Sequence, residues 1–304
     1  MQKYRPKHFG DNIIQNHNKR RPAMFKRKIL EKLEAWKKSN LRKPLILRGA
    51  RQVGKTTIVN EFGLQYDNYL YFNMEKSENV KLFEMEIPLD DLVTTLFASV
   101  GKTQKPGQTL IFIDEIQNSP KTIALLRYFY EQRPDLHVIA AGSLLENLID
   151  VKVSFPVGRV QYLALRPCSF YEFLGATGKN NLLAVLNGNP EISTAFHDQL
   201  MHWFNLYAII GGMPEAVKIF AETRDIVALN DVYETLVQAY KDDAEKYVIG
   251  NKLTDTVRFI LSYGWAFAGE TITLGNFANS GYKSREVGEA FRLLEKAMLL
   301  EMVY

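Results

Sequence analysis

Residues 49–56 have the spacing of a loop that binds phosphate groups: Gly, four residues, Gly, Lys and Thr. Glycines let backbone N–H groups turn inward around a phosphate, and the following helix points the positive end of its dipole at the anion. Lys55 would contact the β- and γ-phosphates, and the Thr56 hydroxyl would contact Mg²⁺. The sequence therefore predicts a nucleoside triphosphate site formed by Gly49, Ala50, Arg51, Gln52, Val53, Gly54, Lys55, Thr56 and Thr57.

A second group of reactive residues lies in the stretch TLIFIDEIQ. The apolar run TLIFI is typical of a buried strand, and Asp114 and Glu115 come at its carboxyl end, where open α/β sheets bind ligands. Asp114 would hold the Mg²⁺ shell, and Glu115 could orient and deprotonate an attacking water. An acidic turn after a strand is the alternative, but the phosphate loop upstream favours a site that hydrolyses ATP with Mg²⁺.

Two further catalytic candidates each have a structural alternative. Ser143 follows the apolar run HVIAAG, so its hydroxyl could contact the γ-phosphate or the attacking water, or it could cap the next helix. Arg159, in FPVGRV, could neutralise charge in the transition state, from the same subunit or from a neighbouring one. It could equally be a surface arginine at the start of a strand.

The elements that must position these residues are predicted by alternating patterns. Helical patterns, notably 55–63 and 122–132, separate short apolar runs. Strands alternating with helices predict a parallel sheet covered on both faces, with right-handed crossovers. The fold class is therefore α/β, a P-loop NTPase sheet flanked by helices. The predicted strands are 45–49, 69–74, 109–114, 137–143 and 159–165.

The rest of the chain reads mainly as helix. A helix is predicted over 22–38, and a small all-helical region follows residue 166. Residues 254–304 read as helix, turn, helix, helix and strand, the strand being the final LEMVY. Because the chain ends on this apolar run, we expect it to be a shortened form of a longer protein. The predicted parts are a basic leader over 1–21, a nucleotide-binding core over 22–166, a helical region over 167–250 and a final segment over 251–304.

The composition excludes several classes of protein. The 304 residues are 46% hydrophobic and 24% charged, which is typical of a globular protein. No apolar run approaches the roughly 20 residues that span a bilayer, so no membrane segment is expected. A single cysteine, Cys168, allows no internal disulfide and fits a cytoplasmic location. Five histidines and one cysteine also exclude a structural zinc site.

Charge is unevenly distributed along the chain. Residues 1–43 carry a net charge of +11, whereas the whole chain carries +4. Such asymmetry can mark an arm that faces an anionic partner. The alternative is a solvated, partly disordered leader followed by an amphipathic helix.

Several motifs together resemble a known family. RGARQVGKTT, FIDEIQ, AAGSLL, FPVGRVQYLALRPCSFYEF and GGMPEAV are similar to motifs of prokaryotic AAA-superfamily ATPases of the archaeal-ATPase kind, and the resemblance begins near residue 22. It implies that the strand leading to Ser143 lies between the phosphate-loop strand and the acidic strand. Ser143 would then be a sensor and Glu115 the catalytic base. It also implies a winged helix over 251–304 and a further C-terminal domain beyond this sequence.

The favoured function is an ATPase that couples hydrolysis to movement of the helical parts. The alternative is a nucleotide-dependent binding or signalling module with little turnover, and Glu115 favours the first. A GTPase would need an N-K-x-D motif, but NKLT places Thr254 where the aspartate belongs. A small-molecule kinase fits the loop alone, whereas the adjacent Asp114 and Glu115 fit water activation better.

The partners predicted besides ATP are DNA, another protein or a second copy of the chain. In the helix over 284–300, one face would carry Val287, Phe291, Leu294 and Met298 and pack inward. Basic side chains would remain available for DNA phosphates, but three glutamates dilute them, and a purely structural or protein-docking role is the alternative. The basic residues are Lys283, Arg285, Arg292 and Lys296.

Overall fold

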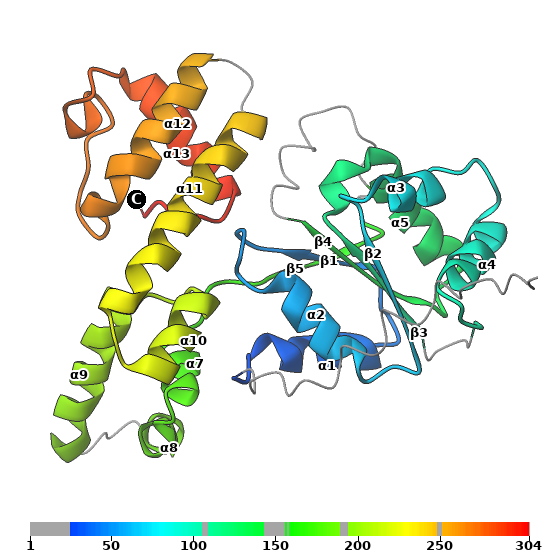
Figure 1. Cartoon of the computed structure of the whole chain (residues 1–304), viewed down its shortest axis with the longest axis horizontal. Coiled ribbons are helices and arrows are strands. Elements are labelled where there is room, and N and C mark those ends of the chain that lie inside the picture. Colours follow the sequence, from blue (N-terminus) through cyan, green and yellow to red (C-terminus); the bar gives the residue numbers. More distant parts are fainter. Residues whose placement is uncertain are drawn as a thin grey trace, which may run out of the picture.

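The computed structural model describes residues 25–104, 109–142, 156, 158–188, 194–247 and 251–303. It contains an α/β part and a helical part, which lie beside each other in Figure 1. The chain passes from the first to the second after the last strand of the sheet.

The α/β part is built on a five-stranded sheet in which every pairing is parallel. The strand order is β2-β3-β4-β1-β5, so β4 lies between β1 and β3, as the resemblance implied. Parallel strands bring their carboxyl ends to the same edge of the sheet. The loop after β1 and the acidic pair at the end of β3 therefore lie at one edge. The strands are β1 (Leu45–Arg48), β2 (Asn68–Asn73), β3 (Thr109–Asp114), β4 (His137–Gly142) and β5 (Gln161–Ala164), at or within two residues of the predicted bounds.

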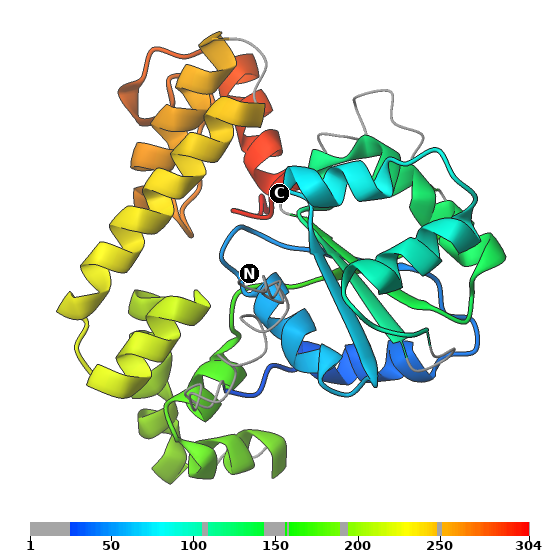
Figure 2. The same ribbon diagram turned by 45° about the vertical axis from the view of Figure 1, so that its right-hand side comes forward.

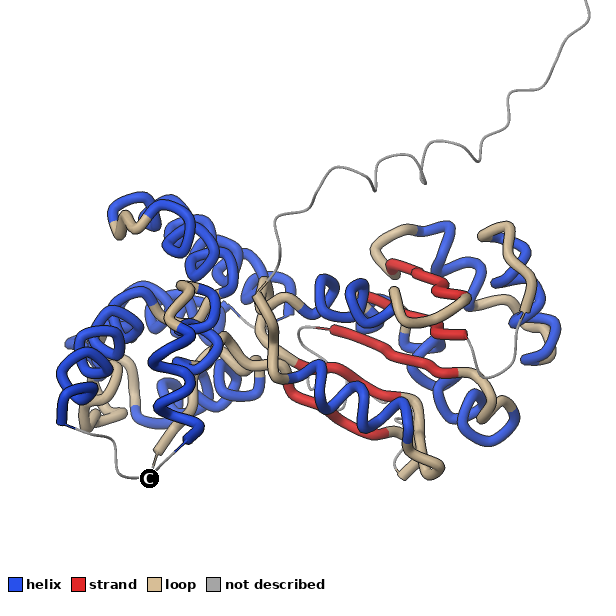
Figure 3. Tube along the Cα trace, turned by 90° about the horizontal axis from the view of Figure 1, so that it is seen from below, coloured by secondary structure: helices blue, strands red, loops and turns tan. Residues whose placement is uncertain are grey.

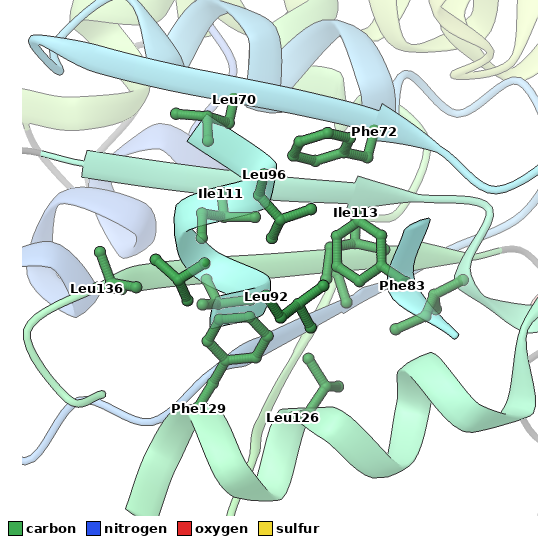
Figure 4. Close-up of a cluster of buried hydrophobic side chains, with 14 of the residues drawn as sticks. Leu70, Phe72, Phe83, Leu92, Leu96, Ile111, Ile113, Leu126, Phe129 and Leu136 are labelled. Atoms are coloured by element: carbon green, nitrogen blue, oxygen red, sulfur yellow. The ribbon is translucent and has the colours of Figure 1, made fainter. Parts of the chain in front are cut away.

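Helices cover both faces of this sheet (Figure 3). One face packs against α1 (Ile29–Lys38) and α2 (Lys55–Gly63). The other packs against α3 (Ser77–Phe83), α4 (Leu89–Ser99) and α5 (Pro120–Gln132). Buried strand side chains alternate between the two cores, as the two-residue period of a strand requires. Figure 4 shows the second core, in which side chains of β2 and β3 pack against α4 and α5.

The helical part contains seven described helices. In Figures 1 and 2 the long helix α11 runs from the group α7–α10 to the pair α12 and α13. Its residue Tyr233 packs with the first group, whereas Leu236 and Tyr240 pack with the second. The helices are α7 (Phe170–Ala176), α8 (Asn180–Gly188), α9 (Thr194–Ile210), α10 (Pro214–Thr223), α11 (Asn230–Tyr247), α12 (Asn251–Tyr263) and α13 (Ser284–Lys296).

Two predictions for the final segment are wrong. The stretch 271–281 forms only a short 3-10 turn at Phe277–Asn279, because the backbone is left-handed at Asn276, Ala278 and Asn279. Residues 300–303 form no strand; Leu300 and Met302 instead pack against the helical core. The described residues of 251–303 therefore form helices and turns without a β-strand, and the winged helix stays a prediction.

Two other predictions for the ends of the chain can be compared with the structure. The helix predicted over 22–38 begins at Ile29, and residues 22–24 lie outside the described part. On α13, Val287, Phe291 and Leu294 are buried, as predicted, whereas Met298 lies beyond the end of the helix and is half-buried. No helix in the described part of the chain is both long enough and apolar enough to cross a membrane.

Candidate active site

The loop between β1 and α2 needs both of its glycines. A Cβ atom at Gly49 would lie 2.4 Å from the carbonyl oxygen of Leu165, which is closer than real contacts allow. Gly54, at the start of α2, has a φ of 95°, a left-handed conformation that side chains disfavour. The two glycines therefore allow the loop to pass close to β5 and then turn directly into the helix.

The side chains of the remaining loop residues divide into two groups. Ala50 and Val53 are buried, so only their backbone can face a ligand. Arg51, Gln52 and Thr57 are exposed. Val53 packs with α2 in the core beneath the sheet, which fixes the loop against the helix that it precedes.

Lys55 is buried inside the loop. Its Nζ donates hydrogen bonds to the carbonyl oxygens of Gly49 and Ala50, both at 2.9 Å. Burial lowers the pKa of Lys55, whereas the nearby carboxylates of Glu115 and Asp114 oppose that shift. A buried ammonium held by carbonyl dipoles is stabilised further by an anion, so this position favours a phosphate in the loop.

The side chains of Thr56 and Asp114 meet, although they come from different elements. Thr56 donates from Oγ1 to Asp114 Oδ2 at 2.7 Å, and Tyr71 OH donates to the same oxygen at 3.2 Å. The backbone N–H of Glu115 donates to Asp114 Oδ1 at 3.1 Å. Burial raises the pKa of Asp114, and the bond from Thr56 opposes that shift. Tyr71, on β2, belongs to this group but was not predicted.

The oxygens of Thr56 and Asp114 fit Mg²⁺. This ion prefers hard oxygen ligands, and proteins commonly supply only one or two of them while phosphates and water supply the rest. The described residues contain no group of three or more His, Cys, Asp or Glu side chains that could hold a metal by itself. Mg²⁺ held by these two oxygens would need further ligands, which phosphate and water could supply.

Glu115 occupies an unusual backbone position directly after Asp114. Its φ of 52° and ψ of 41° are left-handed, a conformation that non-glycine residues adopt mostly at turns and functional sites. Gln117 donates from Nε2 to Glu115 Oε2 at 2.5 Å, which fixes one carboxylate oxygen. Burial raises the pKa of Glu115, and the bond from Gln117 opposes that shift. Gln117 is a further residue that the sequence did not indicate.

Ser143 lies outside the described residues, so its predicted role as a sensor stays a prediction. The preceding residue, Gly142, pairs with Arg48 at the carboxyl end of β1. The chain therefore leaves β4 at the same edge of the sheet as the phosphate loop.

Arg159 lies at the opposite edge of the sheet, so the prediction that it acts within its own subunit is wrong. It precedes β5, which runs parallel to β1. Residues before a parallel strand lie at its amino end, whereas the phosphate loop follows the carboxyl end. The Nε of Arg159 pairs with Glu131 Oε1 of α5 at 3.2 Å.

A role of Arg159 in a neighbouring subunit stays a prediction. Mixing Arg159→Ala protein with Glu115→Gln protein should then restore part of the ATP turnover, because one mixed interface would keep both intact residues. If mixing does not restore ATP turnover and light scattering shows a monomer, Arg159 has no catalytic role in a neighbouring subunit. Its role is then its ion pair with Glu131.

The buried side chain of Arg27 forms a hydrogen bond with the backbone of the phosphate loop. Arg27 is 3% exposed, and its Nε pairs with Glu172 of α7 at 3.1 Å. Its other nitrogens donate to the carbonyl oxygens of Val53, at 3.4 Å, and Arg166, at 2.7 Å. Arg27 thus joins the phosphate loop to the first helix of the helical part. Nothing in the basic stretch around Arg27 distinguishes it from its neighbours.

Two protein-family models match parts of this sequence. Residues 41–174 match the family model of an AAA domain. Residues 201–304 match a domain of unknown function, DUF8612. No curated protein sequence matches the chain.

One solved structure supports the fold of the α/β part and of the helical part that follows it. The Walker-type ATPase PABY2304 of Pyrococcus abyssi is 17% identical, with 91% of each chain covered and a TM-score of 0.52. Drosophila ORC bound to DNA is 13% identical over 90% of this chain and 81% of that chain, with a TM-score of 0.41. At 17% identity the similarity to the Pyrococcus abyssi structure concerns the fold alone, a parallel sheet flanked by helices with a helical C-terminal region.

Proposed function

We propose that this protein binds ATP with Mg²⁺ and hydrolyses it, and that the cycle moves its helical part. One observation carries the proposal: Thr56 of the phosphate loop and Asp114 of β3 meet at 2.7 Å, with Glu115 directly beside them. These are the positions from which an AAA domain could hold a metal-bound triphosphate and activate water.

Each residue has a distinct part in the proposed reaction. The backbone N–H groups of the loop and of the first turn of α2 would surround the β-phosphate, and the buried ammonium of Lys55 would contact the β- and γ-phosphates. Thr56 and Asp114 would hold Mg²⁺, which when bound neutralises charge on the phosphates. Glu115 would accept a proton from the attacking water.

The state of Glu115 supports hydrolysis over the alternative of a binding module with little turnover. A general base works best when its pKa is closer to the working pH than that of a free carboxyl group. Burial raises the pKa of Glu115 in that direction. Gln117 in addition holds one oxygen of this carboxylate by a hydrogen bond, which would help to orient it toward a water.

The proposal also covers the cellular location of the protein and its binding partners. The thiol of Cys168 is buried, and burial raises its pKa to about 12, which suits an unreactive core cysteine in a cytoplasmic protein. On α13, Arg285 and Arg292 are exposed whereas Val287 and Phe291 are buried, so this helix offers basic groups for DNA phosphates. A protein partner, or a second copy of the chain, is the other proposed ligand of the helical part.

Replacing Lys55 with alanine should weaken ATP binding. The change removes a charge-assisted contact worth about 1.5–3 kcal/mol, which corresponds to an affinity about ten- to a hundredfold lower. Calorimetry with ATP and Mg²⁺ measures the effect. Lys81→Ala is the matched control, because Lys81 is exposed on α3 and should bind ATP as the unchanged protein does. Equal affinity in Lys55→Ala, or no binding by the unchanged protein, would contradict the proposal.

A further inference from the structure

Arg51 lies in the phosphate loop, but its side chain and backbone are both held by helix α11. The Nη1 of Arg51 pairs with Asp243 Oδ1 at 2.6 Å. The hydroxyl of Tyr240 donates to the carbonyl oxygen of Arg51 at 3.3 Å. Tyr240 and Asp243 are three residues apart and therefore lie on one face of α11. In Figure 1 the blue segment between β1 and α2 reaches toward this yellow helix.

The two members of the ion pair differ in burial. The side chain of Asp243 is 8% exposed, whereas that of Arg51 is 44% exposed. A buried carboxylate is costly without a cation, so Asp243 depends on Arg51 more than Arg51 depends on Asp243. Arg51 has a planar group of N–H donors that suits phosphate as well as carboxylate, and Asp243 bonds only its Nη1.

The position of Arg51 in the chain places this pair at the phosphate site. Arg51 directly follows Ala50, whose carbonyl oxygen accepts a hydrogen bond from Lys55 at 2.9 Å. A triphosphate in the loop would therefore bring negative charge close to Asp243. It would repel the Asp243 carboxylate and compete with it for the Arg51 guanidinium.

We propose that Arg51 is shared between Asp243 and the phosphates of a bound nucleotide, so that nucleotide binding releases α11 from the phosphate loop. The inference rests on the nucleotide binding proposed above. Because α11 packs against α10 at one end and against α12 at the other, and shares a buried core with α13, its release would be transmitted to the whole helical part. Asp243 would thus act as a positioning residue that holds the nucleotide-free arrangement.

Competition for Arg51 predicts whether replacing Asp243 raises or lowers the affinity for ATP. Two ligands that exclude each other are coupled reciprocally, so weakening one strengthens the other. Asp243→Asn should therefore bind ATP more tightly than the unchanged protein, by about five- to 150-fold, the usual range of such couplings. Tyr240→Phe, which loses only one hydrogen bond to the loop, should change affinity in the same direction by less.

The experiment is a comparison of ATP affinity by calorimetry at constant Mg²⁺. Asp242→Asn is the matched control, since Asp242 is the neighbouring carboxylate on α11, is exposed and accepts a bond from Gln238 of the same helix. It should leave affinity unchanged. A second readout is the distance between probes at Lys81→Cys and Glu234→Cys, both exposed positions, labelled while Cys168 remains buried. ATP should shift this distance in the unchanged protein, and Asp243→Asn should show the shifted distance without ATP.

The outcomes separate this inference from the proposed function. If the unchanged protein binds ATP but Asp243→Asn binds it equally or more weakly, the sharing of Arg51 is wrong while nucleotide binding stands. If the unchanged protein binds no ATP, the proposed function fails first. If Asp243→Asn does not fold, the ATP affinity of Tyr240→Phe is the test. An ATP affinity of Tyr240→Phe that equals or falls below that of the unchanged protein overturns the inference.

Discussion

Replacing Glu115 with glutamine should lower ATP turnover by about 10²–10⁴-fold, the usual contribution of a general base. Glutamine keeps the shape of the side chain but cannot accept the proton of the attacking water. ATP affinity should hardly change, because Thr56, Asp114 and Lys55 would hold the nucleotide and the metal. Single-turnover hydrolysis and calorimetry, measured on the same preparation, separate the two effects.

The matched control is Glu78→Gln, which removes an exposed carboxylate from α3 and should leave turnover unchanged. Turnover should also depend on pH. Because burial raises the pKa of Glu115, the ionised base is present above that raised pKa and is lost as the pH falls through it. Unchanged single-turnover hydrolysis in Glu115→Gln would place the base on another residue.

Replacing Arg27 with methionine should cost about 3–5 kcal/mol of stability, the usual effect of removing one partner of a buried ion pair. The side chains of Arg27 and Glu172 are 4% and 7% exposed, so the remaining carboxylate would stay buried without its cation. Its bonds from the backbone N–H groups of Lys28 and Ser169, both 2.8 Å, would remain. The carbonyl oxygens of Val53 and Arg166 would also lose a donor.

Urea unfolding measures this loss. Adding Glu172→Gln to Arg27→Met should recover part of the free energy of unfolding, because no uncompensated charge is then buried. Lys26→Met is the matched control: its ion pair with Glu31 is 77% and 66% exposed, and exposed pairs contribute about 0–1 kcal/mol. A loss below about 1 kcal/mol in Arg27→Met would show that the pair does not stabilise the fold.

The sheet and the centre of the site could be predicted because each depends on residues close together in the sequence. Every strand lies in a short apolar run of the sequence. The conformation of the loop from Gly49 to Thr56 depends on its own residues, because the glycines allow the turn and Thr56 lies in the first turn of α2. Asp114 and Glu115 lie at the carboxyl end of β3, a fully buried strand, and the parallel order of strands brings them to the loop.

The remaining contacts could not be predicted because they join residues far apart in the sequence. Tyr71 reaches Asp114 over 43 positions, Arg27 reaches Glu172 over 145, and Arg51 reaches Asp243 over 192. No spacing or motif indicates such partners; only the folded chain brings them together. Arg159 differs from these contacts: it stands at the start of the predicted strand 159–165, and in a parallel sheet this is the end opposite to the phosphate loop.

Hydrolysis of labelled ATP by an excess of the unchanged protein, with Mg²⁺ present, tests the central claim most directly. Under this condition all ATP is bound once, so slow product release does not hide the chemical step. We expect ADP and phosphate to form, to stop forming when a chelator removes Mg²⁺, and to form at least about a hundredfold more slowly with Glu115→Gln. ATP that stays bound and intact in both proteins would contradict hydrolysis and leave a nucleotide-dependent binding module.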